Sequence, residues 1–178
     1  LFLDDNAGTV AAAFPGVLGE SLIGKALQDG LWQLQTIDLR DFGEGRHKNV
    51  DDTPSGGGAG MVLRADVAAA AIEHVQAQTA NLPLLMPSPR GQIFDQAMAQ
   101  QLAKGPGAIF FCNRFEGVDE RVIEAFDVRE VSIGDYILSG GEPAALAMSD
   151  AIIRLLPGVM GSALSSQEES FANGLLLS

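Results

Sequence analysis

The sequence is poor in cysteine and in positive charge, and each shortage narrows what the protein can be. Its 178 residues contain one cysteine, Cys112, which excludes an internal disulfide and argues against a cysteine-rich metal site. Lys and Arg number 11 against 23 Asp and Glu, giving a formal net charge of −12. Such a surface repels a polyanion such as RNA. A nucleic-acid partner would need residues outside this chain or a local basic patch, for which the candidates are Arg40, Arg46, His47 and Lys48.

Long apolar runs are also missing. No stretch reaches the roughly 18–20 uninterrupted apolar residues that cross a bilayer. The first residues, 1–5, lack the basic start and apolar core of a secretory signal. Hydrophobic residues make up 47% of the chain and charged residues 19%, as in soluble globular proteins. We therefore expect a cytoplasmic protein with no membrane partner, folded as one domain or as a domain plus part of another.

Helix-like and strand-like segments alternate along the chain. We expect helices over residues 20–30, 65–79, 95–104, 118–126 and 143–156, and strands over 31–39, 82–86, 108–112 and 128–133. Asp95 is a candidate N-cap, residues 108–112 are apolar throughout, and residues 87–91 read as a turn. This alternation predicts an α/β fold with a mostly parallel sheet and helices on both faces.

Glycine-rich segments supply the first candidate sites. The run from Asp51 to Met61 could hold an anion through its backbone N–H groups. It is not a P-loop, because no Lys-Ser/Thr pair follows, and a flexible loop is the simpler interpretation.

Two further runs, Cys112–Arg121 and Ser132–Glu142, follow predicted strands. In a parallel sheet with these strands adjacent, Ser88, Asn113, Glu116 and residues 133–141 would meet at the edge where α/β proteins bind ligands. Glycines there let the backbone approach a flat ligand closely, and ordinary tight turns are the alternative.

Charged residues near the C-terminal end allow two interpretations. Asp150 and Arg154 are four apart on a predicted helix, which suits an exposed ion pair. Arg154 could instead point into a site and stabilise developing negative charge. Glu168 and Glu169 read as solvated carboxylates, whereas His74 is expected at the surface and Cys112 in the core.

Taken together, the runs closely resemble one family, the bacterial tRNA (guanine-N1)-methyltransferase, TrmD, of the SPOUT class. The similarity covers about residues 13–176. It is carried by Arg46-His47 with residues 50–54, by residues 56–61, 114–122 and 132–142, and by residues 156–159, 169–171 and 174–176.

The resemblance implies a SPOUT-type deep trefoil knot, S-adenosylmethionine as cofactor, and a homodimer whose sites form across the interface. The implied cofactor residues are Met86, Pro87, Ser88, Pro89, Asn113, Phe115, Glu116, Ile133, Gly134, Tyr136, Leu138, Gly140 and Gly141. The implied substrate-binding residues are Arg46, His47, Asp51, Asp52, Gly57, Gly58, Gly60 and Met61.

The substrate implied by the resemblance is tRNA with a guanosine immediately 3′ of the anticodon. Guanine N1 carries a proton, so a carboxylate must remove it while a cation stabilises the charge that builds on O6. At the family's base and charge-stabilising positions this chain has Glu169, where aspartate is usual, and Arg154. The resemblance also associates the activity with Mg²⁺, although no metal ligand is assigned.

The chain departs from the family pattern in four ways. We expect residues 1–160 to form the methyltransferase domain and residues 161–178 an interdomain linker, with the C-terminal helical tRNA-binding domain absent. Residues 8–14 replace the usual opening run, Asn113 replaces a glycine and Phe115 a tyrosine. We therefore expect this chain alone to be weakly active or inactive. The alternatives are a non-catalytic S-adenosylmethionine-binding dimerisation module and a SPOUT methyltransferase of another RNA.

Overall fold

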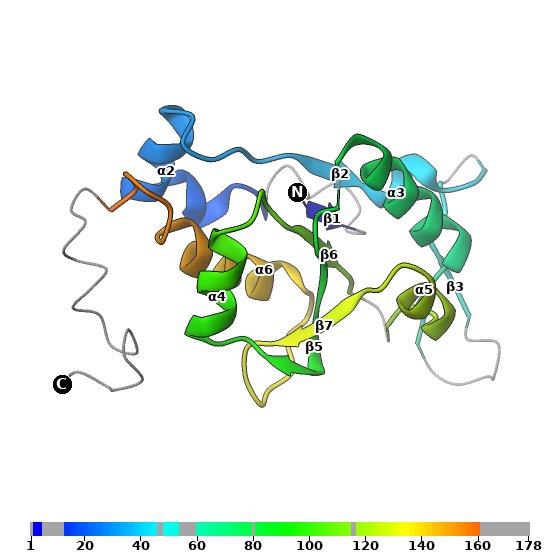
Figure 1. The fold of residues 1–178 in the computed structure, drawn as a ribbon. Helices are drawn as coiled ribbons and strands as arrows, with labels where there is room; N and C mark the ends of the chain where they lie inside the picture. Colours follow the sequence, from blue (N-terminus) through cyan, green and yellow to red (C-terminus); the bar gives the residue numbers. More distant parts are fainter. Residues whose placement is uncertain are drawn as a thin grey trace.

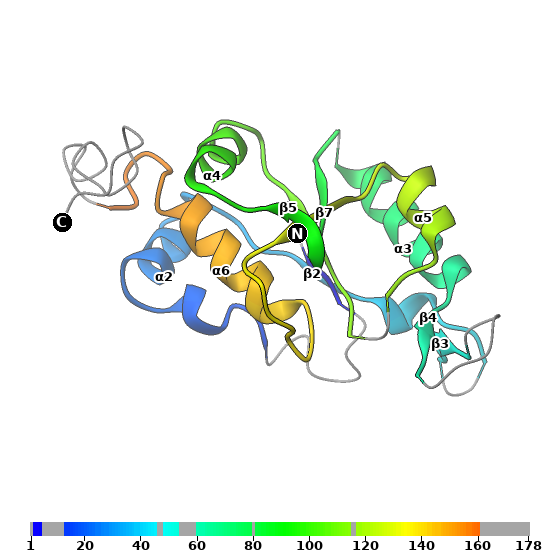
Figure 2. The same cartoon turned by 90° about the horizontal axis from the view of Figure 1, so that it is seen from below.

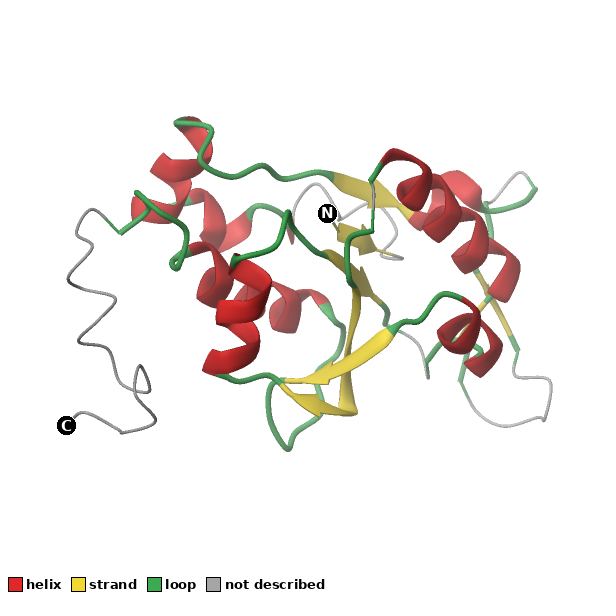
Figure 3. Ribbon diagram, viewed as in Figure 1, coloured by secondary structure: helices red, strands yellow, loops and turns green. Residues whose placement is uncertain are grey.

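The computed structural model describes residues 2–4, 13–45, 48–53, 60–79, 81–114 and 117–160. A five-stranded parallel sheet lies at its centre, with strand order β2-β1-β6-β5-β7 (Figures 1 and 3). The strands are β1 Phe2–Asp4, β2 Thr36–Asp38, β5 Leu84–Ile93, β6 Ile109–Cys112 and β7 Arg129–Ser132. The prediction of an α/β fold with a parallel sheet is therefore confirmed.

Helices cover both faces of this sheet (Figure 2). The α-helices are α2 Ser21–Gln28, α3 Ala65–Gln78, α4 Gln96–Ala103, α5 Glu120–Ala125 and α6 Glu142–Ile153, and the short 3₁₀ helices are η1 Gly16–Gly19 and η2 Leu39–Phe42. α3 and α5 lie on one side of the sheet, and α2, α4 and α6 lie on the other.

The alternation of side chains along the central strands explains this layering. Phe111 of β6 packs in a core cluster with residues of α3 and α5, whereas its neighbours Phe110 and Cys112 pack with residues of α6. Successive side chains of a strand point to opposite faces, so an all-apolar β6 requires a hydrophobic cover on each side. Cys112 is fully buried, as expected.

The helices largely follow the predicted ranges, because their ends are set by local chemistry. The Asp95 carboxylate accepts a hydrogen bond from the Met98 N–H at 2.8 Å, which caps α4. α5 begins at Glu120 rather than at the predicted Val118, because Asp119 caps it and Val118 forms a bridge with Leu63. His74 lies exposed on α3, as expected.

Two predicted strands differ from the structure. The strand expected over residues 31–39 is confined to β2, Thr36–Asp38. The residues before β2 lie against α2 instead, where the Trp32 indole N–H donates to the Ile23 carbonyl at 2.9 Å. Residues 2–4 form β1 between β2 and β6, a position for which the sequence predicted no element.

The second difference concerns β5, which continues to Ile93 through the segment predicted as a turn. Val131 of β7 pairs with both Pro87 and Gln92, so residues 88–91 form an irregularity within the strand. Gly91 allows this, because a Cβ there would collide with the backbone of Glu130 and Val131. Ser88, Pro89 and Arg90 lie within this irregularity and have no partner in the register of β5 with β7.

The glycine-rich run joins two short antiparallel strands, β3 Asp51–Asp52 and β4 Val62–Leu63. The Leu63 N–H donates to the Gly117 carbonyl at 3.4 Å, which links this hairpin to the segment after β6. None of the helices in the described part of the chain is long and apolar enough to cross a membrane.

Candidate functional site

A pocket of about 480 Å³ lies where β5, β6 and β7 give way to loops and α6 begins. The carboxyl ends of parallel strands are the usual ligand-binding edge of an α/β sheet. The predicted cofactor residues on its wall are Met86, Pro87, Ser88, Pro89, Asn113, Ile133, Gly134, Tyr136, Leu138, Gly140 and Gly141. The other two, Phe115 and Glu116, lie outside the described residues. The structure thus brings together all of these residues that it describes, and their role in binding stays a prediction.

The loop after β6 and the start of α6 form one tightly packed wall. The Gly141 N–H donates to the Asn113 carbonyl at 3.1 Å. A Cβ on Gly141 would stand 3.0 Å from the Cα of Cys112. The absence of a side chain therefore lets the backbone at Gly141 lie closer to β6 than most residues would allow. Where Gly140 and Gly141 line this wall, main chain is therefore open to a ligand.

The loop after β7 lines the pocket with the apolar residues Ile133, Ile137 and Leu138 and with Tyr136. The Ser132 hydroxyl donates to the Gly134 carbonyl at 3.0 Å and fixes the start of the loop. Beyond it, Tyr136, Ile137 and Leu138 are exposed, Ile137 by 80%. Exposed apolar side chains at the mouth of a pocket are typical of surfaces that a ligand or a partner covers.

Two arginines on the pocket wall, Arg90 and Arg114, received no role from the sequence. Arg90 donates to Glu130 at 2.8 Å and to Glu120 at 3.1 Å, and these hydrogen bonds raise the pKa of Arg90. Arg114 donates to Glu142 at 2.7 Å. Little in the sequence signalled these pairs, because the partners are 28 to 40 positions apart in the chain.

Those predicted substrate-binding residues that the structure describes lie apart from this pocket. Asp51, Asp52, Gly60 and Met61 belong to the β3–β4 hairpin or its connection, and none of them lines the pocket wall. Arg46, His47, Gly57 and Gly58 lie outside the described residues. The hairpin nevertheless borders the site, since Leu63 pairs with Val118, which does line the pocket.

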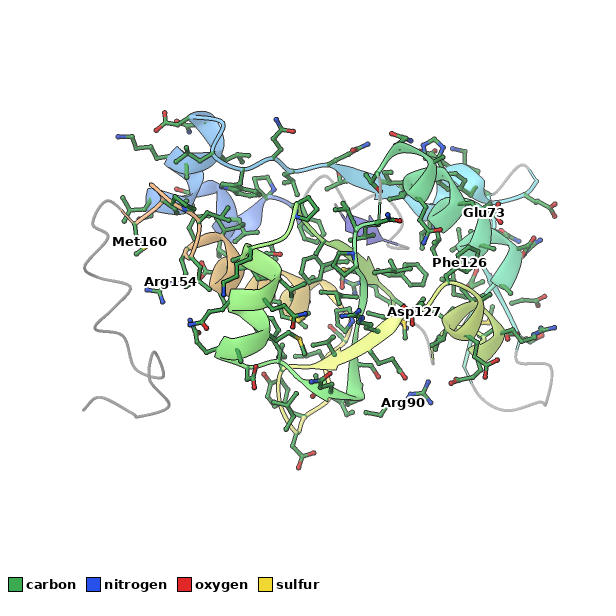
Figure 4. The ribbon with its side chains drawn as sticks, viewed as in Figure 1. Glu73, Arg90, Phe126, Asp127, Arg154 and Met160 are labelled. Atoms are coloured by element: carbon green, nitrogen blue, oxygen red, sulfur yellow. The ribbon has the colours of Figure 1, made fainter. Side chains whose placement is uncertain are left out.

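Of the two predicted catalytic residues the structure describes Arg154, which does not lie at the pocket of its own chain. Arg154 follows α6 as its C-cap, is half-buried, and does not line the pocket. Ala144 does line it, and ten residues of α-helix span about 15 Å. Figure 4 shows Arg154 and Arg90 at opposite sides of the molecule. Glu169 lies outside the described residues.

Charge at the candidate basic patch is partly neutralised. Lys48 pairs with Asp41 at 2.7 Å, and Arg40 is half-buried with its Nε unpartnered among the described atoms. Within the described ranges, no cluster of three or more His, Cys, Asp or Glu could hold a metal ion.

Comparison with known proteins assigns the chain to a family. Residues 9–178 match the model described as tRNA (Guanine-1)-methyltransferase TrmD. The chain is 63% identical over 165 residues to the tRNA (guanine-N(1)-)-methyltransferase of Ruegeria sp. (strain TM1040), covering 92% of this chain and 68% of the relative. A protein of the same name from Mesorhizobium japonicum is 60% identical over 163 residues, covering 92% and 70%. The chain therefore belongs to the TrmD family of tRNA (guanine-1)-methyltransferases.

Proposed function

We propose that this protein methylates N1 of a guanine in tRNA, with S-adenosylmethionine as methyl donor, and that the target is the guanosine immediately 3′ of the anticodon. The observation that carries the proposal is the pocket at the carboxyl ends of β5, β6 and β7, lined by the residues expected to hold the cofactor, in a chain of this family. The proposed setting is the cytoplasm.

The pocket suits S-adenosylmethionine in size and in chemistry. A volume of about 480 Å³ falls in the usual range for small-molecule sites. Main chain at Gly140 and Gly141 offers a flat surface for an adenine, and the loop of Ile133, Tyr136 and Leu138 offers an apolar cover. When bound, the cofactor would supply a methyl group activated by its sulfonium.

The protein's own residues would make guanine N1 nucleophilic. We assign the removal of the N1 proton to the Glu169 carboxylate and the stabilisation of charge on O6 to the Arg154 guanidinium. Asp51, Asp52 and the hairpin that carries them would orient the tRNA beside the pocket, together with Arg46 and His47.

Arg154 is about 15 Å along α6 from the nearest pocket residue of that helix, so one chain does not complete the site. We therefore propose a homodimer in which the pocket of one subunit meets Arg154 of the other. Within each chain, residues 1–160 would form the methyltransferase domain, with a SPOUT-type knot, and residues 161–178 a linker.

The test is a single-turnover assay with the protein in excess over a tRNA transcript that has guanosine after the anticodon. Digestion and mass spectrometry should detect 1-methylguanosine, and a transcript with adenosine at that position should give none. Enzyme excess is needed because the acidic surface is expected to weaken tRNA capture. Absence of product from a chain that binds the cofactor would favour a binding module, and methylation elsewhere would favour another RNA.

A further inference from the structure

The pocket is assembled from three segments that lie far apart in the sequence. They are β5 with its irregularity, the segment that joins β6 to α5, and β7 with the loop that follows it. Ser88 and Pro89 lie within the irregularity, where the register of β5 with β7 gives them no partner. Holding the three segments in place before a ligand arrives strengthens binding, because less of the site remains to be ordered.

One side chain of the irregularity reaches both of the other segments. The Arg90 Nε donates to Glu130 Oε1 on β7 at 2.8 Å, and the Arg90 Nη2 donates at 3.1 Å to Oε2 of Glu120, the first residue of α5. Arg90 extends from β5 toward α5 in Figure 4. Because all three residues line the pocket, this guanidinium joins its three segments at one point on the wall.

The chemistry of arginine suits this bridge. The N–H groups of the planar guanidinium point in fixed directions, so one side chain can hold carboxylates on two elements. The Glu130 side chain is 20% exposed and that of Glu120 is 62% exposed, so water screens the Glu130 pair less. The next residue, Gly91, already lies against Glu130, since a Cβ there would collide with the Glu130 backbone. Backbone packing and the ion pairs therefore hold adjacent residues of the irregularity.

We propose that Arg90 is a positioning residue, which holds the irregularity of β5 against β7 and α5 and so places Ser88 and Pro89 in the wall of the cofactor pocket. Arg90 acts through its two glutamates rather than through contact with the cofactor. Its side chain is exposed, so the effect on affinity is moderate. The inference rests on the proposed function and adds a residue to it.

The test is calorimetric titration of S-adenosylmethionine into the full chain and its variants. Arg90→Gln should weaken binding by about 3- to 10-fold, because two ion pairs are lost and each exposed pair is weak. Arg90→Lys should recover part of this loss, since an ammonium can still pair with one glutamate. The difference between wild type and Arg90→Gln should shrink as the salt concentration rises, because salt screens exposed pairs.

A glutamate variant separates positioning from direct contact with the cofactor. Glu130→Gln should also weaken binding, although it removes no positive charge from the pocket. In an Arg90→Gln background, Glu130→Gln should cause no further loss, because both residues act through the same contact. If Arg90 bound the cofactor carboxylate directly, Glu130→Gln would leave the affinity unchanged or raise it.

Arg64→Gln is the matched control. Arg64 likewise pairs with two carboxylates, Glu44 and Asp66, and it does not line the pocket. Its replacement should leave the affinity for S-adenosylmethionine unchanged. The urea midpoint of each variant shows that the chain is folded under the conditions of the titration.

Unchanged affinity in Arg90→Gln would overturn the proposal, as would unchanged or higher affinity in Glu130→Gln. So would a further loss in the double variant, a lysine no better than glutamine, a difference independent of salt, or an equal loss in Arg64→Gln. These results concern the inference alone, provided that the wild-type chain binds S-adenosylmethionine. A folded wild-type chain that does not bind it would overturn the proposed function and this inference with it.

Discussion

At the scale of single residues, adjacent glycines of the pocket are required by different contacts. A Cβ at Gly140 would meet the ends of two side chains, Glu142 and Arg114, whereas a Cβ at Gly141 would meet the backbone at Cys112. Side chains can shift, but the backbone of a buried central strand cannot. Gly140 therefore leaves room for an ion pair, whereas Gly141 allows α6 to pack closely on β6.

This difference predicts opposite results for two alanine variants. Gly141→Ala should lower the free energy of unfolding by about 1–3 kcal/mol, because it overpacks α6 against β6. Gly140→Ala should cost less stability and act mainly on ligand affinity. Urea unfolding of both variants checks this, and equal destabilisation by the two would contradict it.

Asp119 predicts a dependence of stability on pH. Hydrogen bonds from the Arg121 side chain and its backbone N–H lower the pKa of Asp119 from 3.8 to about 2. A carboxyl whose pKa is lower in the folded state stabilises that state above its unfolded pKa, and the contribution disappears as the pH falls through the folded value.

Asp119→Asn should therefore lower the urea midpoint of wild type more at about pH 5 than at about pH 3. Asp135→Asn, an exposed carboxylate in the loop after β7, is the control for general loss of negative charge. A difference between wild type and Asp119→Asn that stays constant or grows on acidification would contradict the account.

At the scale of elements, the sequence predicted best where local chemistry decides the outcome. The N-cap at Asp95 and the helix that follows it could be predicted from the sequence alone. So could β6, because its apolar run is typical of a strand that is covered on both faces. β5 could not, because Pro87 and Gly91 are turn signals, and only contact with β7 shows that the strand resumes after them. β1 is similarly defined by its two neighbours in the sheet.

The same contrast applies to the site. The glycine-rich and apolar pocket residues could be predicted because their runs identify the family. The Arg114–Glu142 pair could not, because the two residues are 28 positions apart and meet only when α6 packs beside β6.

Burial of β6 on both faces predicts a large cost for truncating its side chains. Phe111 is fully buried between β6 and α3, so Phe111→Ala should lower the free energy of unfolding by about 3–5 kcal/mol. Ile93→Ala, on the neighbouring strand but 72% exposed, should cost no more than about 0.5 kcal/mol. Chemical denaturation of both variants checks the ranking, and similar costs would mean that β6 is not the centre of the core.

At the scale of the whole molecule, the proposed activity depends on a second copy of the chain. The pocket and Arg154 lie at different ends of α6, so the proposed roles of the two would require two chains to meet. The net charge of −12 also makes tRNA capture sensitive to salt and to any basic residues that the pairing brings together.

Shared sites predict that two inactive variants restore activity when mixed. Ser88→Trp should fill the pocket, and Arg154→Ala should remove the charge stabiliser. After the two are refolded together, half of the dimers are mixed and each has one intact site, so about a quarter of wild-type methyl transfer should return. Arg129→Ala, an exposed arginine on the far edge of the sheet, should keep its activity alone. No recovery in the mixture would place both functions within one chain.

The central claim is that the pocket at the ends of β5, β6 and β7 binds S-adenosylmethionine. The most direct measurement is calorimetric titration of S-adenosylmethionine into the wild-type chain and into two tryptophan variants. Saturable binding of one cofactor per chain is predicted for the wild type and for Gln100→Trp, on the exposed surface of α4, and none for a folded Ser88→Trp. Absence of binding by a folded wild-type chain, or undiminished binding by Ser88→Trp, would contradict the account.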